Sequence, residues 1–227
     1  SGIRIRALPE GTIAFPHIPL ITVEGPIAIA QLLETTLLTL VNYASLIATN
    51  AARFRLAAGQ GKGLLEFGLR RAQGPDGGVS ASRYSFIGGF DATSNVQAGY
   101  LYGIPVAGTH AHSWIQSFLK LDDVMGIRLT DAKGADHDFS RLVLQAREEL
   151  GYTRTNDDEL AAFIGYAVAW PDSFLALVDT YDTLKSGVPN FLAVALALHR
   201  LGYRPLGIRL DSGDLAFLSK ESRRLFR

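Results

Sequence analysis

The sequence lacks cysteine altogether, and it contains only one methionine and two tryptophans in 227 residues. Without cysteine the chain can form no disulfide bond and no metal site that depends on thiolate ligands. Proteins of reducing compartments need no disulfides, so this absence fits the cytoplasmic location that we expect for this protein.

The chain also has no excess charge of either sign, because 22 lysines and arginines balance 22 aspartates and glutamates. No block of basic residues stands out along it. Binding to nucleic acid relies on clustered positive charge, so we expect no nucleic-acid partner. A small anionic substrate is compatible with this balance.

An uninterrupted hydrophobic run is missing as well. The longest apolar stretch, residues 27–48, is broken by Gln31, Glu34 and Asn42, so we expect no membrane span. Hydrophobic residues nevertheless make up 48% of the chain, which is enough to bury a substantial core.

Residues 1–63 are expected to form a β lead-in followed by one long helix. Residues 19–24 have the composition of a strand, and Pro26 is well placed at the first position of a helix. Apolar residues then recur in steps of three and four, which predicts one buried stripe: Leu33, Leu37, Leu40, Ala44, Ile47, Ala51 and Phe54. The glycines of residues 59–63 end this helix and form a turn.

Residues 64–227 read as about five strand–helix units with a helical excursion over residues 115–172. The predicted strands are residues 64–70, 88–91, 104–112, 174–179 and 205–210. The predicted helices are residues 79–87, 95–102, 139–150, 158–170, 189–201 and 214–226, and the glycines before residue 79 are expected to form a loop. Alternating strands and helices indicate an α/β fold with a parallel sheet, either open or closed into a barrel.

Each predicted strand carries a charged or titratable residue at its carboxyl end. These residues are Arg70 with Arg71, Asp91, His112, Asp179, and Arg209 with Asp211. In a parallel α/β protein the carboxyl ends of strands meet on one face, where active sites are found. We therefore expect them to share a functional site.

The residue types limit the chemistry of that site without fixing it. Arginine binds carboxylate or phosphate oxygens through two parallel hydrogen bonds. Paired aspartates hold Mg²⁺ or stabilise an electron-poor sugar carbon. Histidine serves as base, nucleophile or metal ligand. Phe67 either offers its face to an aromatic ring or packs in the core.

The pair His110 and His112 also suggests the zinc ligands of barrel hydrolases. Such a site needs further ligands, and the remaining histidines are His17, His137 and His199. His17 and His199 sit in segments that favour structural roles, and His137 lies in a charged loop, so we do not favour zinc.

Six short motifs, taken in their order along the chain, resemble those of nicotinate phosphoribosyltransferase, a type II phosphoribosyltransferase. They are FGLRRAQGPDGG at 67–78, GGFDATSN at 88–95, GTHAHS at 108–113, VDTYDT at 178–183, SGVPN at 186–190 and RLDSGDL at 209–215. The resemblance implies an irregular α/β barrel and an enzyme of pyridine nucleotide salvage. It further implies transfer of the phosphoribosyl group from phosphoribosyl pyrophosphate to nicotinate, with ATP as co-substrate, Mg²⁺ as cofactor, and a homodimer whose active site is shared between subunits.

The same resemblance assigns roles to individual residues. His112 matches the histidine that ATP phosphorylates, and Asp179 and Asp211 match acidic catalytic positions near the ribose and magnesium. The remaining matches are to substrate-binding positions: Phe67, Arg70, Asp91, Thr109, Ser113 and Arg209. Ser113 is placed among them because a helix is expected to begin there, and a helix start stabilises a neighbouring phosphate.

The family continues beyond RLDSGDL with further strands and phosphate-binding loops. The resemblance therefore predicts a partial barrel, incomplete at both ends, and little turnover by the isolated chain. Two alternatives stay open: a relative that uses nicotinamide or quinolinate, and a non-catalytic fragment.

Overall fold

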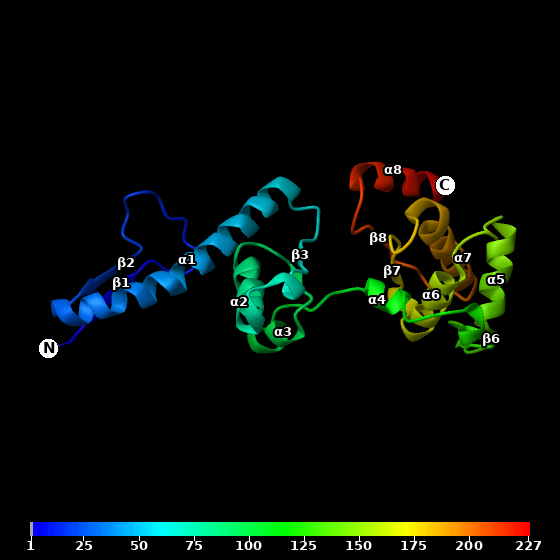
Figure 1. The fold of residues 1–227 in the computed structure, drawn as a ribbon, viewed down its shortest axis with the longest axis horizontal. Helices are drawn as coiled ribbons and strands as arrows, with labels where there is room; N and C mark the ends of the chain where they lie inside the picture. The colour runs from blue at the N-terminus through cyan, green and yellow to red at the C-terminus, as the bar shows by residue number, and fades with distance from the viewer. Residues whose placement is uncertain (1) are drawn as a thin grey trace. The chain divides into compact units, whose positions relative to one another are not determined.

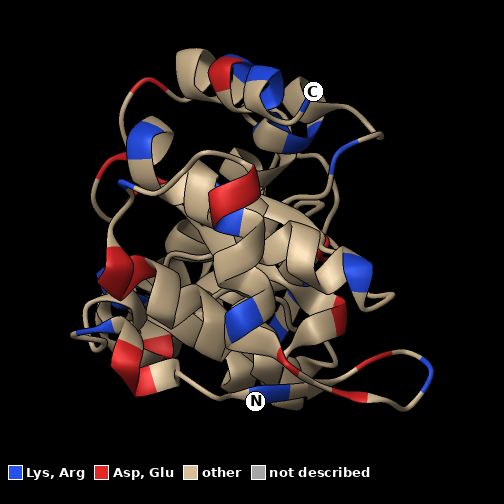
Figure 2. Ribbon diagram, turned by 90° about the vertical axis from the view of Figure 1, so that its right-hand side faces the viewer, with Lys and Arg blue, Asp and Glu red and all other residues tan. Residues whose placement is uncertain are grey.

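The computed structural model describes residues 2–227 and divides the chain into two compact units. The first unit ends at Gly108 and the second begins at Thr109. The division expected from the sequence, after residue 63, falls inside the first unit, at the end of its long helix. Basic and acidic residues are interspersed along the ribbon (Figure 2).

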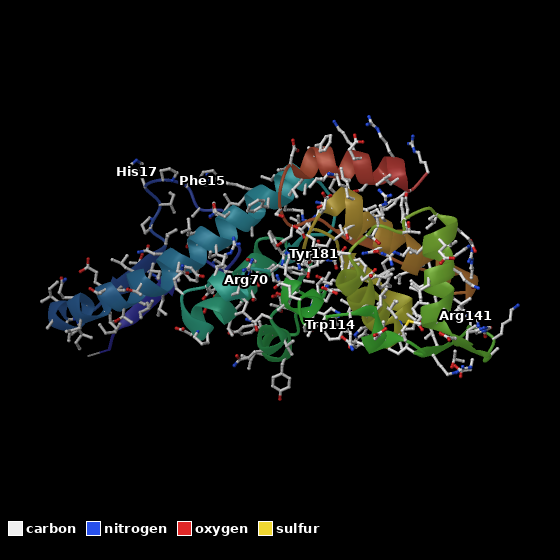
Figure 3. All side chains as sticks on the ribbon, turned by 45° about the vertical axis from the view of Figure 1, so that its right-hand side comes forward. Phe15, His17, Arg70, Trp114, Arg141 and Tyr181 are labelled. Atoms are coloured by element: carbon white, nitrogen blue, oxygen red, sulfur yellow. The ribbon has the colours of Figure 1, made fainter. Side chains whose placement is uncertain are left out.

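The first unit opens with an antiparallel pair of strands, β1 (Arg4–Ala7) and β2 (Ile21–Glu24). Figure 3 shows Phe15 and His17 on the loop that joins them, and both side chains are exposed. The chain passes from this hairpin into the long helix α1 (Ile27–Ala58), which follows Pro26 and ends at Gly59, as predicted (Figure 1). Gly59 has φ 72°, a left-handed conformation that glycine adopts without strain.

The apolar stripe of α1 is only partly covered. Ala51 is buried and packs near α2, whereas Leu40 and Phe54 of the predicted stripe are 65% and 61% exposed. By length and composition α1 could also cross a membrane, since an 18-residue window has mean hydropathy 1.3. Mostly buried core helices of water-soluble proteins pass the same test, although none of this window is buried here. A single such helix is weak evidence, and the absence of a membrane span stays a prediction.

After α1 the first unit holds short parallel strands and three helical segments. They are β3 (Leu65–Glu66), η1 (Leu69–Arg71), α2 (Gly74–Ile87), β4 (Ala92–Thr93) and α3 (Val96–Tyr102). The strand predicted for residues 64–70 was wrong beyond Glu66, where the chain turns into η1. The loop predicted before residue 79 was also wrong, because α2 already begins at Gly74, with proline in its first turn.

The strand predicted for residues 104–112 was wrong over most of its length. Only Val106 forms a bridge, parallel to Thr93, and His112 already lies in the short helix α4 (His112–Ile115). His110 and His112 are therefore not held on one side of a strand. They are placed by separate contacts, described below.

The second unit is built around helices and one parallel strand pair. After α4 come η2 (Leu121–Val124), β5 (Arg128–Thr130), β6 (Asp136–Asp138), α5 (Phe139–Glu149), α6 (Asp157–Ala169) and η3 (Pro171–Ser173). They are followed by β7 (Leu175–Leu177), η4 (Thr183–Gly187), α7 (Val188–Arg200), β8 (Gly207–Arg209) and α8 (Leu215–Leu225). The antiparallel pair β5–β6 and the π-helical segment η4 were not predicted.

The core of the second unit lies between α5, α6 and α7 and the strand β7. Phe163 of α6, Phe174 before β7 and Val194 of α7 are fully buried there. Burial of such side chains supplies the main driving force for folding of this unit.

The strands confirm an α/β chain, with parallel pairs β3–β4 and β7–β8. Each sheet of residues 2–227 has two strands, and none is closed. The α/β class is thus established, and the barrel is a finer expectation taken up below.

Candidate functional site

The pairing of β7 with β8 places predicted site residues at the ends of two adjacent strands. Leu177 lies opposite Arg209 in the parallel register, and the Val178 amide donates to the Arg209 carbonyl at 3.2 Å. Asp179 follows one strand end and Asp211 follows the other. The carboxyl ends of this pair therefore carry acidic and basic groups together, as the sequence predicted.

Arg209 joins two of the other predicted residues. Its guanidinium donates to the Thr109 hydroxyl at 2.9 Å and to a carboxylate oxygen of Asp211 at 2.6 Å. The guanidinium and the hydroxyl are partly exposed and lie in contact. The guanidinium carries N–H donors suited to an anionic ligand, and the hydroxyl helps to orient it by accepting one of its hydrogen bonds.

His112 lies beside Asp179. The distance between His112 Nε2 and Asp179 Oδ1 is 3.4 Å, and the carboxylate side chain is almost entirely buried while the imidazole is 39% exposed. Ser212 donates to the second oxygen of Asp179 at 2.5 Å. The carboxylate is thus fixed from one side by Ser212 and faces the imidazole with the other.

Ser212 was not singled out from the sequence, although it lies within the RLDSGDL motif. The turn that carries it is short because Gly213 has φ 76° and Asp214 caps α8 by accepting from the Phe217 amide at 3.0 Å. Ser113, in contrast, is an exposed residue in α4. That helix begins at His112 and has only four residues.

The predicted site residues of the first unit have separate surroundings. Arg70 is exposed in η1 (Figure 3). Phe67 lies just before η1 and is half-buried. Asp91 accepts hydrogen bonds from the Leu64 amide at 2.6 Å and from Arg55 at 2.5 Å. The Leu64 amide and the Arg55 guanidinium hold the pKa of Asp91 below its usual value. Asp91 therefore ties the end of α1 to the start of β3, and its predicted contact with substrate is untested.

Glu66 is a residue of the first unit that the sequence reasoning missed. Its carboxylate accepts from Ser82 at 2.9 Å, from Thr93 at 2.8 Å and from the Gly68 amide. These bonds fix the backbone of residues 66–68, which carries Phe67.

The histidines do not gather around a metal. Among residues 2–227 no group of three histidine, aspartate or glutamate side chains is arranged to hold a metal ion. His137 pairs with Asp131 at 2.9 Å, while His110 is buried against β7. The geometry of the described residues gives no support to the zinc alternative.

The helix α6 carries a buried carboxylate. Glu159 is fully buried and accepts from Ser186 at 2.6 Å and from Asn190 at 3.1 Å. Burial raises the pKa of Glu159 to about 7, partly opposed by the hydrogen bonds from Ser186 and Asn190 and reinforced by the charges of Asp182 and Asp179. This group links α6 to the segment that follows Asp179.

The unchanged protein is expected to lose stability as the pH rises through 7, because Glu159 ionises. Replacement of Glu159 by glutamine should remove this loss. Because the pKa of Glu159 is raised from 4.5 to about 7 on folding, its contribution is complete below pH 4.5 and disappears as the pH rises through 7. The difference amounts to about 3 kcal/mol in the free energy of unfolding. Urea unfolding at pH 5.5, 7 and 8.5, followed by the fluorescence of Trp114 and Trp170, measures it.

Both tryptophans of the sequence lie in the second unit, so their fluorescence reports on that unit. Glu148→Gln is the matched control, because Glu148 is an exposed glutamate on neighbouring α5. A Glu159→Gln protein that weakens above pH 7 as much as the unchanged chain would contradict the prediction.

With this geometry in view, we compared the chain with known proteins. No family model matches it. It is 58% identical over 227 residues to a nicotinate phosphoribosyltransferase of Dictyostelium discoideum, covering all of this chain and 38% of that protein. It is also 58% identical over 236 residues to nicotinate phosphoribosyltransferase 1 of Arabidopsis thaliana, again over the whole chain and over 42% of the relative.

A solved structure agrees with these sequence relatives. The crystal structure of human nicotinic acid phosphoribosyltransferase superposes with a TM-score of 0.86 at 53% identity, covering 99% of this chain and 47% of the human one. The resemblance seen in the six motifs is thereby confirmed. The chain is related over its whole length to nicotinate phosphoribosyltransferases, and it spans less than half of the length of these relatives.

Proposed function

We propose that this chain serves the transfer of a phosphoribosyl group from phosphoribosyl pyrophosphate to nicotinate, which yields nicotinate mononucleotide for NAD salvage. The observation that carries the proposal is the assembly at the ends of β7 and β8. There Arg209 meets Thr109 and His112 meets Asp179, in a chain 58% identical to a nicotinate phosphoribosyltransferase.

Arg209, oriented by Thr109, is suited to bind the carboxylate of nicotinate. A guanidinium offers paired N–H donors that match the two oxygens of a carboxylate, and the Thr109 hydroxyl helps to orient the guanidinium by accepting from it at 2.9 Å. Asp211 holds the guanidinium in place by accepting at 2.6 Å. Nicotinamide lacks the negative charge that the guanidinium attracts, so this arrangement binds nicotinate in preference to nicotinamide.

His112 is suited to accept a phosphoryl group from ATP. Asp179 faces its Nε2 atom at 3.4 Å, which leaves Nδ1 as the nitrogen available to attack the γ-phosphorus. The new bond joins nitrogen to phosphorus, and the bond to the β-phosphate oxygen breaks as ADP leaves with the electron pair. The added charge then alters the site's affinity for the sugar substrate.

In the transfer step the pyridine nitrogen attacks the anomeric carbon, and the carbon–oxygen bond to pyrophosphate breaks with its electron pair on the leaving group. The enzyme's task is to hold the two substrates in line and to stabilise the developing charges. We propose that Asp179 and Asp211 stabilise the electron-poor sugar carbon. Mg²⁺ ordinarily takes one or two carboxylates together with substrate phosphates, so we treat it as entering with the pyrophosphate substrate.

The finer features of the expectation belong to the same proposal. They are an irregular (β/α) barrel for the complete fold, a homodimer with a shared active site, and a cytoplasmic location without nucleic-acid or membrane partners. The parallel pair β7–β8 supports the first of them, and the balanced charge supports the absence of a nucleic-acid partner.

The test is an assay of product formation from nicotinate, nicotinamide and quinolinate, each with phosphoribosyl pyrophosphate, ATP and Mg²⁺, carried out on a complete enzyme that contains this segment. We expect nicotinate mononucleotide to be the main product. Arg209→Ala should raise the KM for nicotinate roughly tenfold to a hundredfold, because a hydrogen bond to a charged group contributes about 1.5–3 kcal/mol. The KM for ATP should change little.

Arg204→Ala, at an exposed arginine of the same segment, is the matched control. Equal losses for nicotinate and ATP would argue that Arg209 is merely structural. Preferred use of nicotinamide or quinolinate would replace the proposed substrate, and a chain with no turnover of any base would favour the non-catalytic alternative.

A further inference from the structure

His110 is a buried residue of the GTHAHS motif whose contacts the proposed reaction does not use. It lies between Thr109 and His112, the two members of this segment that reach the site. Its side chain is buried, with 8% of the residue exposed, and it packs against α6. The Tyr166 ring stands edge-on to the imidazole with 4.7 Å between ring centroids.

The imidazole has one defined polar contact. The backbone amide of Leu177 donates to His110 Nε2 at 3.2 Å. Leu177 is fully buried in β7, and among the described residues β7 pairs with β8 alone. The amide therefore belongs to the open edge of the strand, and without the histidine it would be a buried donor that lacks an acceptor.

This contact fixes the protonation state of the ring. An amide donor requires a lone pair on Nε2, so the single proton of the neutral imidazole lies on Nδ1. A doubly protonated ring would present no acceptor. Burial lowers the pKa of His110 to about 4, with smaller contributions from the charges of Arg209 and His112 and an opposing one from the Ala111 backbone. The ring is accordingly neutral throughout the physiological range.

The same short segment is attached to the site at its two ends. Thr109 accepts from Arg209 at 2.9 Å and donates to the His110 carbonyl at 2.9 Å. Two residues further on, His112 Nε2 lies 3.4 Å from Asp179. His110 provides the attachment between them, and its partner Leu177 stands opposite Arg209 and two residues before Asp179.

We propose that His110 is a positioning residue, whose neutral imidazole fastens the segment from Thr109 to His112 onto the open edge of β7. In this way it sets Thr109 against Arg209 and His112 against Asp179. What the two positioned residues then do rests on the proposed function, whereas the attachment itself does not. The ring contacts with Tyr166 and Phe163 hold the imidazole in the orientation that the attachment needs.

Two amide substitutions separate this role from simple filling of space. In His110→Gln the longer side chain brings an amide oxygen to the position of Nε2, so it can still accept the Leu177 proton. In His110→Asn the shorter side chain reaches only the position of Nδ1. Both variants are neutral and polar, and thermal unfolding with circular dichroism confirms that each is folded before comparison.

The first measurement is nuclear magnetic resonance of the whole chain. In the unchanged protein we expect the ring nitrogens of His110 to show the tautomer protonated on Nδ1, and the Leu177 amide to be protected from hydrogen exchange. We expect exchange of that amide to be roughly fivefold to tenfold faster in His110→Asn and near normal in His110→Gln, as expected for loss of a hydrogen bond of about 1 kcal/mol. A proton on Nε2, or equal protection in both folded variants, would overturn the proposal.

The second measurement is phosphate incorporation from ATP into His112. We expect His110→Asn to lower its maximal rate roughly tenfold or more with an unchanged KM for ATP, because only the geometry of His112 is disturbed, and His110→Gln to restore most of the rate. Equal rates in the two variants would overturn the proposal. If the unchanged protein takes up no phosphate, the proposed function fails by itself, and the resonance measurement still decides the role of His110.

Discussion

We expect His112→Ala in a complete enzyme to abolish incorporation of acid-labile phosphate from ATP and to slow formation of nicotinate mononucleotide roughly a hundredfold relative to the unchanged enzyme. The imidazole is the proposed nucleophile, and it is accessible because it is 39% exposed and lies 3.4 Å from the buried Asp179. Alanine offers no nitrogen to the γ-phosphorus, so ATP loses its route into the reaction. Radiolabelled phosphate from ATP, measured before and after mild acid treatment, tests the first part, and product formation tests the second.

His199→Ala is the matched control, because His199 is an exposed histidine near the end of α7. It should keep full phosphate incorporation. Unchanged labelling of the His112→Ala protein would remove the proposed role of His112, whatever the effect on product formation.

Asp179→Asn should give a graded result rather than a complete loss. The amide keeps the shape of the side chain and can still contact Ser212, but it no longer offers a charged acceptor to His112 Nε2. We therefore expect slower phosphorylation of an intact nucleophile. The contrast between abolition at His112 and slowing at Asp179 distinguishes the group that reacts from the group that orients it.

Helix ends and strands could be predicted from the sequence where the local pattern was strong. Pro26 and Gly59 mark the two ends of α1, and the chain turns at both as expected. The apolar run of residues 174–179 and the strand before Asp211 both form, and they pair in parallel. These signals depend on the conformational limits of proline and glycine and on burial, which act within a few residues.

The prediction from sequence was wrong where a polar contact to a distant residue determined the local structure. Residues 104–112 look like a strand, yet the chain leaves the sheet after Val106, and His110 bonds to the edge of β7 through its side chain. The partner, Leu177, lies 67 residues further along the chain. No pattern of apolar residues encodes such a contact.

In the candidate site, too, some residues could be predicted from local patterns and others could not. Its principal members in the second unit, His112, Asp179 and Arg209, were identified from their places at the carboxyl ends of predicted strands. Ser212 and Glu159 were not, because a serine in a turn and a glutamate in a helix are common and carry no signal by themselves. Their importance arises from burial and from bonds to distant residues: Asp179 for the one, and Ser186 and Asn190 for the other.

Gly187→Ala is expected to destabilise the second unit by about 3 kcal/mol or more. A Cβ atom at Gly187 would lie 1.9 Å from the carbonyl oxygen of Val178, 2.7 Å from its carbonyl carbon and 2.9 Å from its Cα. Gly187 has φ −59°, so the requirement for glycine comes from close approach and not from backbone conformation. Backbone atoms at the end of a buried strand cannot rotate away as a side chain can.

Urea unfolding followed by tryptophan fluorescence measures this loss, which corresponds to a fall in Tm of roughly 10 °C or more for a unit of this size. Gly165→Ala is the matched control, since it also adds a methyl group to a helical glycine of the second unit. Its nearest neighbour is the end of the Phe118 ring at 3.2 Å, which can shift at little cost. A Gly187→Ala protein within about 1 kcal/mol of the unchanged chain would refute the prediction.

The expected loss extends from stability to the site, because the obstructed carbonyl belongs to the residue before Asp179. Asp182 closes the intervening turn by accepting from the amides of Leu184 and Lys185 at 3.1 and 2.9 Å, so the turn has little freedom to absorb a displacement. A displacement of Val178 would therefore also displace Asp179 and move its carboxylate away from His112. Where the Gly187→Ala protein is folded at low temperature, it should therefore phosphorylate His112 more slowly than the Gly165→Ala protein at the same folded fraction.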